Sequence, residues 1–286
     1  MAWRQRTGST VCPGCGTLVG VNDESCYTCG RRNPALWGFA PILRRLGHDL
    51  GFTNVATAIC VVLYVATVLF AMGRQGPGGA PPILSLDSAT LFIFGASGNA
   101  PVFQYGRWWT VLSAGWLHGG LLHIAFNMYS LRQLMPPTAE LYGPARTVII
   151  YVVAGASGFI MSSLGGHYMY WVPIPFLQGA SLTIGASAAI FGLIGALYHY
   201  GQRSGSSHIQ RYMAQNAVLW VVWGIFMPGI DNYAHAGGFL GGWLTSRWLD
   251  PLTRERGDHF IAAFVCLAAS ALAIIVSILT GLRYLR

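Results

Sequence analysis

Long runs of apolar residues dominate the chain from residue 53 onward. Several of them reach the roughly 20 residues that a helix needs to cross the hydrocarbon core of a bilayer. The pattern predicts seven membrane-spanning helices, at 53–72, 116–135, 144–165, 184–200, 211–227, 233–249 and 259–282. The fourth to sixth runs are short and interrupted by glycine, so their ends are the least sharply marked.

Composition supports an all-α polytopic membrane protein. Hydrophobic residues make up 53% of the 286 residues and charged residues only 9%, against roughly 25% charged residues in soluble domains. Residues 1–34 are polar and do not resemble a cleavable signal peptide, so we expect insertion through the first span. The formal charge of +8 would suit nucleic acid. The arginines lie at span ends rather than in one patch, however, so no nucleic-acid partner is expected.

The arginines also predict the orientation in the membrane. All 17 basic residues are Arg, and a cytoplasmic N-terminus places 13 of them on the inside, as the positive-inside rule requires. Loop 166–183 then lies outside and carries no basic residue. We expect a multi-pass protein of a prokaryotic plasma (inner) membrane, surrounded by membrane lipids, with its N-terminus in the cytoplasm.

Two Cys-x-x-Cys pairs, each followed by Gly, lie near the N-terminus. Ten residues separate the pair Cys12 and Cys15 from the pair Cys26 and Cys29. This spacing suits tetrahedral coordination of zinc by four thiolates. Iron in a rubredoxin-like site and two disulfides are the alternatives, and a cytoplasmic location disfavours disulfides. So short a module needs a staple to fold, which predicts a structural metal. Docking of a cytoplasmic partner is the alternative role.

Four polar residues in the even-numbered spans should share one membrane depth. His123 and Asn127 are four apart in the second span and share a helix face, while Ser187 and His235 lie near the starts of the fourth and sixth. These spans run in the same direction, so all four side chains fall near the outer end. Ionisable residues inside a bilayer are costly and tend to be functional. A Ser hydroxyl within reach of a His ring is what base-assisted nucleophilic attack requires.

Each of these residues also has a simpler interpretation. A single Ser in a span usually bonds its own helix backbone, and a single His often only packs. His118 lies about 140° round the predicted second helix from His123 and need not join it. Asp231 precedes His235 by four residues, but its position in a short outer loop favours a Ser–His dyad over a triad. The shared depth is what favours catalysis.

These residues resemble the motifs of the rhomboid family of intramembrane serine proteases, over roughly residues 53–250. The stretch from His118 through His123 to Asn127 resembles the family's second-helix motif. Gly185-Ala186-Ser187 is similar to its G-x-S nucleophile, and His235-Ala236-Gly237 to its sixth-helix base.

The resemblance implies six core helices around a water-accessible cavity that opens to the outside. It implies Ser187 as nucleophile and His235 as base, with Phe191 beneath the histidine ring and Gly185 and His118 in support. The backbone N–H of Ser187 and the side chains of His123 and Asn127 would hold the oxyanion. No cofactor is expected for catalysis. The implied substrates are single-span membrane proteins, cleaved near the outer membrane face.

The chain departs from the family pattern before the second helix. The family's Trp-Arg pair reads Trp109-Thr110, with Arg107 three residues ahead of Thr110. The resemblance therefore does not predict the anchor of the first outer loop, about residues 73–107.

We divide the chain into four parts: a zinc-ribbon-like metal module (1–34), a linker or interfacial segment (35–52), the six-helix core (53–250), and an inner loop with a seventh helix (251–286). Two other classes remain. A catalytically inactive rhomboid-like factor would bind membrane proteins without cutting them. A transporter or channel would spread its polar residues through the membrane depth.

Overall fold

The computed structural model describes residues 4–40, 46–74, 81–172, 174, 178–227 and 229–285. The chain forms two compact units, Met1–Gly51 and Phe52–Arg286. Some predictions concern residues outside the described ranges: Arg44, Arg45 and Arg286 of the orientation argument, residues 41–45 of the predicted linker, and residues 75–80 of the first outer loop.

The first unit is small and contains a two-stranded antiparallel sheet. Strand β1 (Ser9–Val11) pairs with β2 (Leu18–Gly20), and Thr10 lies opposite Val19. The turn between the strands carries the first cysteine pair. Val19, Cys12 and Cys26 form its buried cluster. So small an apolar core gives little stability by itself, which leaves a role for a cross-link or a metal.

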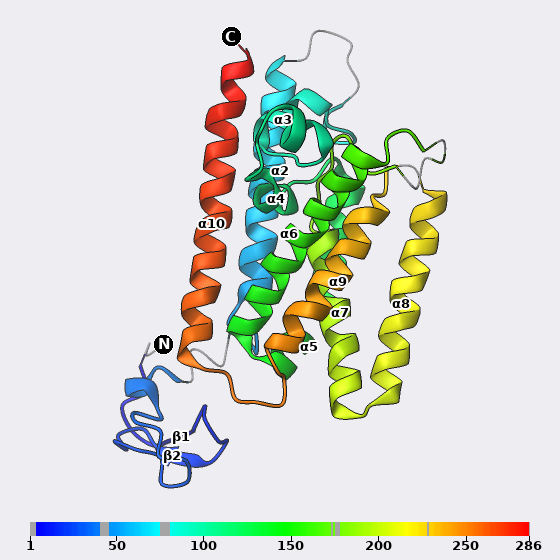
Figure 1. The fold of residues 1–286 in the computed structure, drawn as a ribbon. Coiled ribbons are helices and arrows are strands. Elements are labelled where there is room, and N and C mark those ends of the chain that lie inside the picture. Colours follow the sequence, from blue (N-terminus) through cyan, green and yellow to red (C-terminus); the bar gives the residue numbers. More distant parts are fainter. Residues whose placement is uncertain are drawn as a thin grey trace. The chain divides into compact units, whose positions relative to one another are not determined.

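The second unit is built of helices. Its long helices are α2 (Phe52–Arg74), α5 (Leu121–Tyr142), α6 (Pro144–Tyr168), α7 (Ser187–Ser204), α8 (Ser207–Phe226), α9 (Asn232–Trp248) and α10 (Gly257–Gly281) (Figure 1). Short helices α3 (Ser88–Phe94), η2 (Ala100–Gln104), α4 (Thr110–Ser113) and η3 (Ala114–Trp116) lie between α2 and α5, and η5 (Leu282–Leu285) follows α10.

Each predicted span corresponds to one of these long helices, which confirms the all-α class. Judged by length and composition alone, three helices among the described residues are long and apolar enough to cross a membrane. They are Phe52–Arg74, Pro144–Tyr168 and Gly257–Tyr284. The other four are shorter or more polar, in keeping with their polar and glycine residues.

The predicted range of the second span, 116–135, is wrong at both ends. Helix α5 begins at Leu121 because the preceding Gly120 is fully extended, with φ −178°. At its other end α5 continues through Pro136 and Pro137, although each proline removes one helical N–H donor. Buried contacts of Met135 and Ala139 on both sides of the prolines hold this part of the helix in place.

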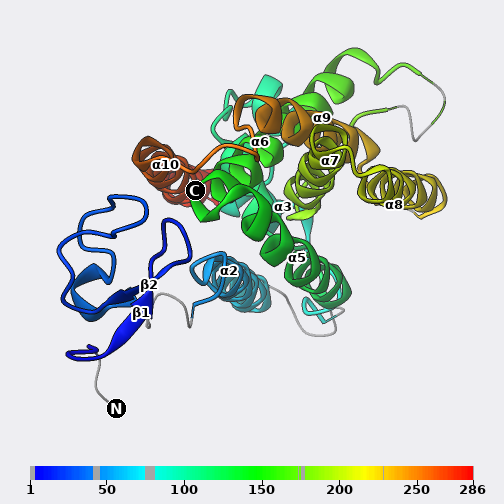
Figure 2. The ribbon, with the colours of Figure 1, turned by 90° about the horizontal axis from the view of Figure 1, so that it is seen from below.

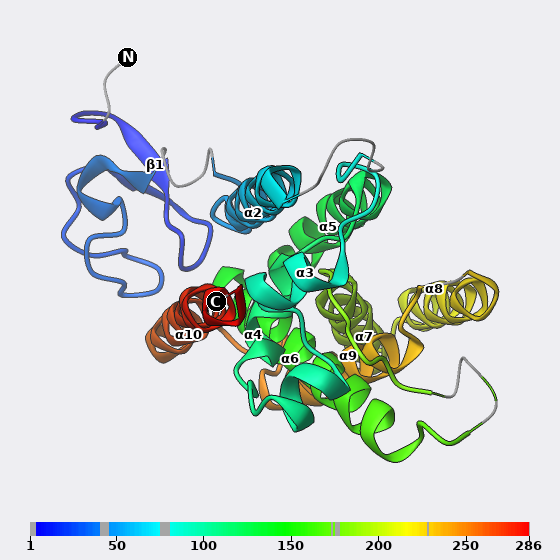
Figure 3. The same ribbon diagram turned by 90° about the horizontal axis from the view of Figure 1, so that it is seen from above.

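Helices α6, α7 and α9 make the most extensive contacts in the second unit. The end views show α7 and α9 between α6 and the peripheral α8 (Figures 2 and 3). Glycines bring α7 and α9 into backbone contact, because a Cβ added at Gly242 would lie 2.0 Å from the carbonyl oxygen of Gly192. This close packing fixes the two helices that carry Ser187 and His235.

Substitution of Gly242 tests that packing. We expect Gly242→Ala to lower the free energy of unfolding by about 3 kcal/mol, at the upper end of the usual cost of overpacking, because the obstacle is backbone. Thermal unfolding in detergent micelles measures the change. Gly73→Ala is the matched control, since an added Cβ there meets nothing within 4 Å and should stabilise the helix slightly. Equal melting temperatures for the two variants would contradict the close approach.

Arg107 anchors the segment between α2 and α5. Its buried guanidinium donates to the carbonyl oxygen of Phe92 at 2.6 Å and to that of Ser277, in α10, at 2.7 Å. It also lies over the Phe92 ring at 4.4 Å. Thr110, where the family motif has Arg, donates its hydroxyl to the carbonyl oxygen of Arg107 at 2.7 Å. Arg107 therefore ties the segment between α2 and α5 to α10.

Candidate active site and metal-binding site

Ser187 and His235 meet at the first turns of α7 and α9. His235 Nε2 lies 2.9 Å from Ser187 Oγ, within hydrogen-bond distance. The imidazole is buried and stacks on the ring of Phe191, with centroids 4.1 Å apart and planes 12° from parallel. The stacking fixes the plane of the imidazole, so its Nε2 stays directed at the hydroxyl.

The start of α7 leaves backbone donors free beside Ser187. Ala186, at the N-cap position, makes no side-chain cap bond. The first N–H groups of a helix have no partner inside the helix, and such groups attract anions. The preceding segment is held by Gly185 N, which donates to Ala114 O at 3.0 Å. Gly185 has φ +119°, which L side chains rarely adopt.

His123 and Asn127 line the same corner from α5. A Cβ added at Gly185 would lie 2.6 Å from His123 Nε2 and 3.9 Å from Asn127 Nδ2. His123 Nδ1 accepts a bond from Gly119 N at 3.3 Å, so in the neutral ring Nε2 carries the proton and can donate. Asn127 Nδ2 donates one hydrogen to His123 O at 2.9 Å and keeps a second. Two side-chain donors thus flank the segment that leads into Ser187.

Asp231 positions the first turn of α9 rather than the ring of His235. One of its carboxylate oxygens accepts from Ala234 N at 3.0 Å, and the other accepts a bond from Ser162. Among the described atoms His235 Nδ1 has no hydrogen-bond partner. The arrangement is that of a Ser–His pair, with Asp231 as the helix cap that orients the histidine backbone.

His118 lies outside α5, in the segment that follows η3. Its buried ring meets that of His123 edge-on, with centroids 5.1 Å apart. The predicted angle of about 140° round the helix between His118 and His123 assumes that both lie in one helix. That angle does not apply, because α5 begins only at Leu121. The structure thus places His118 in contact with His123.

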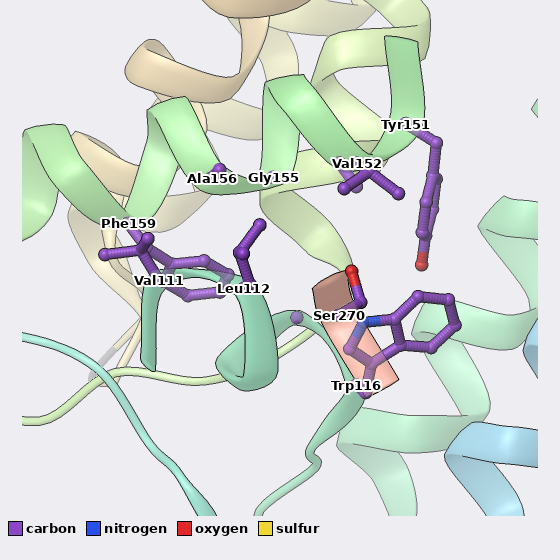
Figure 4. A pocket seen from close by; sticks show the side chains of 11 residues that line it. Val111, Leu112, Trp116, Tyr151, Val152, Gly155, Ala156, Phe159 and Ser270 are labelled. Carbon is purple, nitrogen blue, oxygen red and sulfur yellow. The ribbon is translucent and has the colours of Figure 1, made fainter. Parts of the chain in front are cut away.

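A small, half-open cavity of about 20 Å³ lies mostly among apolar side chains such as Trp116, Val152 and Phe159 (Figure 4). Tyr151 and Ser270 add hydroxyl groups to its wall, and Ala189 contributes from α7. The volume is enough for about one water molecule and far too small for a peptide. Neither Ser187 nor His235 lines it, so it is not a substrate site.

The four N-terminal cysteines form a second cluster, in the first unit. Their sulfur atoms all lie within 4.8 Å of one another, with Cys12 and Cys29 Sγ 3.7 Å apart and Cys15 and Cys26 Sγ 3.5 Å apart. Four thiolates around one zinc ion at ~2.3 Å stand about 3.8 Å apart. A disulfide needs about 2.05 Å, and all four thiols are free. The cluster fits a metal ion.

The thiol pKa values show why a cation suits this cluster. Hydrogen bonds with the side chain and backbone of Thr17 lower the pKa of Cys15 to about 6. The pKa of Cys29 moves the other way, to about 11, because desolvation and the neighbouring thiols outweigh a favourable hydrogen bond with the backbone of Arg31. One thiolate thus opposes the ionisation of the next. A bound divalent cation would remove that opposition.

Fold and site together define an all-α integral membrane protein that carries a hydrogen-bonded Ser–His pair at one end of its helices. The family model described as "Rhomboid domain" matches residues 105–250, about half of the chain. The protein belongs to the rhomboid family.

Curated relatives agree with this assignment. The chain is 32% identical to the rhomboid protease GluP of Bacillus subtilis over 64% of its own length and 34% of the relative's. It is 32% identical to RHOMBOID-like protein 7 of Arabidopsis thaliana, over 57% of this chain and 50% of that one. It is also 28% identical to Inactive RHOMBOID-like protein 8 of the same plant, over 56% and 43%. The chain spans a third to a half of the length of these relatives.

Proposed function

We propose that this protein is an intramembrane serine endopeptidase with a Ser–His dyad. The observation that carries the proposal is the 2.9 Å contact between His235 Nε2 and Ser187 Oγ at the uncapped start of α7. The similarity to a rhomboid protease of Bacillus subtilis supports it. Similarity to an inactive relative means that family membership alone does not decide activity, so the proposal depends on the site itself.

In the proposed reaction Ser187 Oγ attacks the carbonyl carbon of a peptide bond while His235 Nε2 accepts the hydroxyl proton. His235 then returns this proton to the leaving amine, and the C–N bond breaks to leave an ester on Ser187. Water hydrolyses the ester, with His235 again as base. The negative charge on the carbonyl oxygen is stabilised by the Ser187 N–H and by the side chains of His123 and Asn127.

We further propose that the end of the helices carrying Ser187 faces the outside of a prokaryotic inner membrane, with the N-terminus in the cytoplasm. The arginine distribution supports this orientation. An intact spanning helix hides its carbonyl groups in hydrogen bonds, and exposing each one in hydrocarbon costs several kcal/mol. Substrates are therefore single-span proteins whose outer helix end is loosened by Gly, Pro or polar residues.

The position of the cut tests this proposal. Purified protein should cleave a single-span substrate at or just outside the outer end of its helix, after a small residue, and mass spectrometry of the fragments locates the bond. Binding of the substrate without cleavage would favour the inactive, membrane-protein-binding alternative. A cut in the cytoplasmic half of the substrate helix would refute the proposed orientation.

For the cysteine cluster we propose a structural zinc ion held by Cys12, Cys15, Cys26 and Cys29. The sulfur separations of 3.5 and 3.7 Å support tetrahedral coordination. Binding of the ion would contribute the folding free energy that the small buried cluster of this unit does not provide. A second proposed role of the module is to dock a cytoplasmic partner. This role rests on the proposed orientation alone.

Metal analysis tests the zinc proposal. Protein purified without chelator should contain about one zinc ion per chain, and Cys12→Ser or Cys29→Ser should lose it because three thiolates hold a structural zinc poorly. Cys60→Ser is the matched control, since Cys60 lies in α2, outside the cluster. Iron in place of zinc, or four oxidised thiols, would contradict the assignment.

A further inference from the structure

A polar pocket lies at the end of α7 and α9 opposite Ser187 and His235. It has a volume of about 310 Å³ and is lined by His199, Gln202, Arg203, Trp243 and Arg247. At 1.5 Å per helical residue, its residues stand roughly 18–24 Å from Ser187 along α7 and roughly 12–18 Å from His235 along α9. Its residues play no part in the proposed proteolysis.

Hydrogen-bond donors dominate the lining. The indole N–H of Trp243 donates to Gln202 Oε1 at 3.0 Å. Because indole can only donate, this contact fixes the amide with its NH₂ group still available. The Arg247 guanidinium lies over the Trp243 ring at 4.9 Å. Gln202, Arg247 and Arg203 thus present amide and guanidinium hydrogens around one space.

The charge of the pocket is only partly neutralised. Arg203 pairs with Asp250 at 3.0 Å, whereas no described carboxylate forms an ion pair with Arg247. Two guanidinium groups and one carboxylate leave an excess positive charge. An exposed arginine that has no acidic partner among the described residues and lies over an aromatic ring beside a second arginine is suited to bind an oxyanion in bidentate fashion.

Hydrogen bonds outside the pocket hold its walls in place. Buried His199 bonds through Nδ1 with the hydroxyl of Tyr142 at 3.4 Å, and that hydroxyl donates to Ala196 O at 2.7 Å. The carbonyl oxygen of Asp250 accepts from the buried guanidinium of Arg146 at 2.8 Å. The site is therefore largely formed before any ligand arrives, which reduces the entropy lost on binding.

The location of the pocket identifies the source of the oxyanion. It lies at the last turns of two membrane helices, and Trp248, the residue that follows Arg247 in the chain, is 88% exposed. Tryptophan at helix ends marks the depth of lipid headgroups, and basic pockets between membrane helices bind anionic headgroups. We propose that this pocket binds the phosphate group of an anionic phospholipid such as phosphatidylglycerol.

Thermal unfolding of the full chain in lipid nanodiscs tests the proposal. Nanodiscs of phosphatidylcholine alone are compared with nanodiscs that also contain phosphatidylglycerol, and the shift in melting temperature is measured within each variant. The wild-type protein should melt higher with phosphatidylglycerol. Each of Arg203→Ala and Arg247→Ala should weaken phosphatidylglycerol binding roughly fivefold, and the double variant should lose the shift.

Arg211→Ala is the matched control. Arg211 is exposed near the start of α8, at the same end of the helices, and among the described residues it bonds only Ser207 O of its own helix. It should keep the full shift. Equal loss in this variant would mean diffuse attraction to a charged surface and would overturn the site, as would a wild-type protein that shows no preference. Inorganic phosphate added to phosphatidylcholine nanodiscs separates the two sources: if it reproduces the whole shift, the lipid is overturned as the ligand.

Discussion

Ser187→Ala should abolish cleavage of a single-span substrate, with a loss of roughly 10⁴-fold or more. The hydroxyl is the only atom of this residue within hydrogen-bond distance of His235, and without it no ester forms. His235→Ala should cost about as much, and the double variant should be no worse than either single one, because nucleophile and base act as a unit. Initial rates with a fluorescent substrate measure all three.

Ser204→Ala is the control for this series. Ser204 lies in the last turn of the same helix and donates to Tyr200 O at 2.8 Å, as a simple helix serine does. This variant should keep full activity. Labelling by a serine-directed phosphonate provides a second measurement, since only proteins with Ser187 should react. Substantial turnover by the Ser187→Ala protein would refute the dyad.

Asn127→Ala should lower kcat by about 10²- to 10³-fold with little change in KM. One preorganised oxyanion donor is typically worth this much, or about 3–4 kcal/mol of transition-state stabilisation. The charge on the carbonyl oxygen exists only after attack, so substrate binding should be spared. His123→Ala should act in the same direction. Steady-state kinetics separates the two parameters.

Gln133→Ala provides the comparison on the same helix, because Gln133 is exposed on α5 and lies six residues beyond Asn127. It should behave as the wild-type protein does. A rise in KM with unchanged kcat in Asn127→Ala would instead assign the residue to substrate binding, which contradicts its role as an oxyanion donor.

Much of this fold could be predicted because it follows from patterns local to the chain. Apolar runs set the number of long helices, and the ends of most of them differ from the predicted ends by only a few residues. The shared depth of His123, Asn127, Ser187 and His235 followed from helix direction alone. Family motifs added the stacking partner Phe191, which lies one turn after Ser187.

What the sequence did not predict depends on contacts between distant segments. The apolar run around His118 continues into α5, so hydropathy gave no sign of the extended Gly120. Arg107 and Ser277 are 170 residues apart, and Ser162 and Asp231 are 69 apart. The basic pocket likewise joins the ends of two helices that only the packing brings together. No local pattern marks such pairs.

The bond from Arg107 to α10 has a consequence for how this protein is subdivided. The matched family domain ends at residue 250, yet a buried guanidinium inside it takes one of its two carbonyl partners from residue 277. A fragment cut at the family boundary would keep the bond to Phe92 O but lose the one to Ser277 O, which would leave a guanidinium donor without a partner and lower the stability. In this chain the folding unit therefore extends beyond the matched family domain and includes α10.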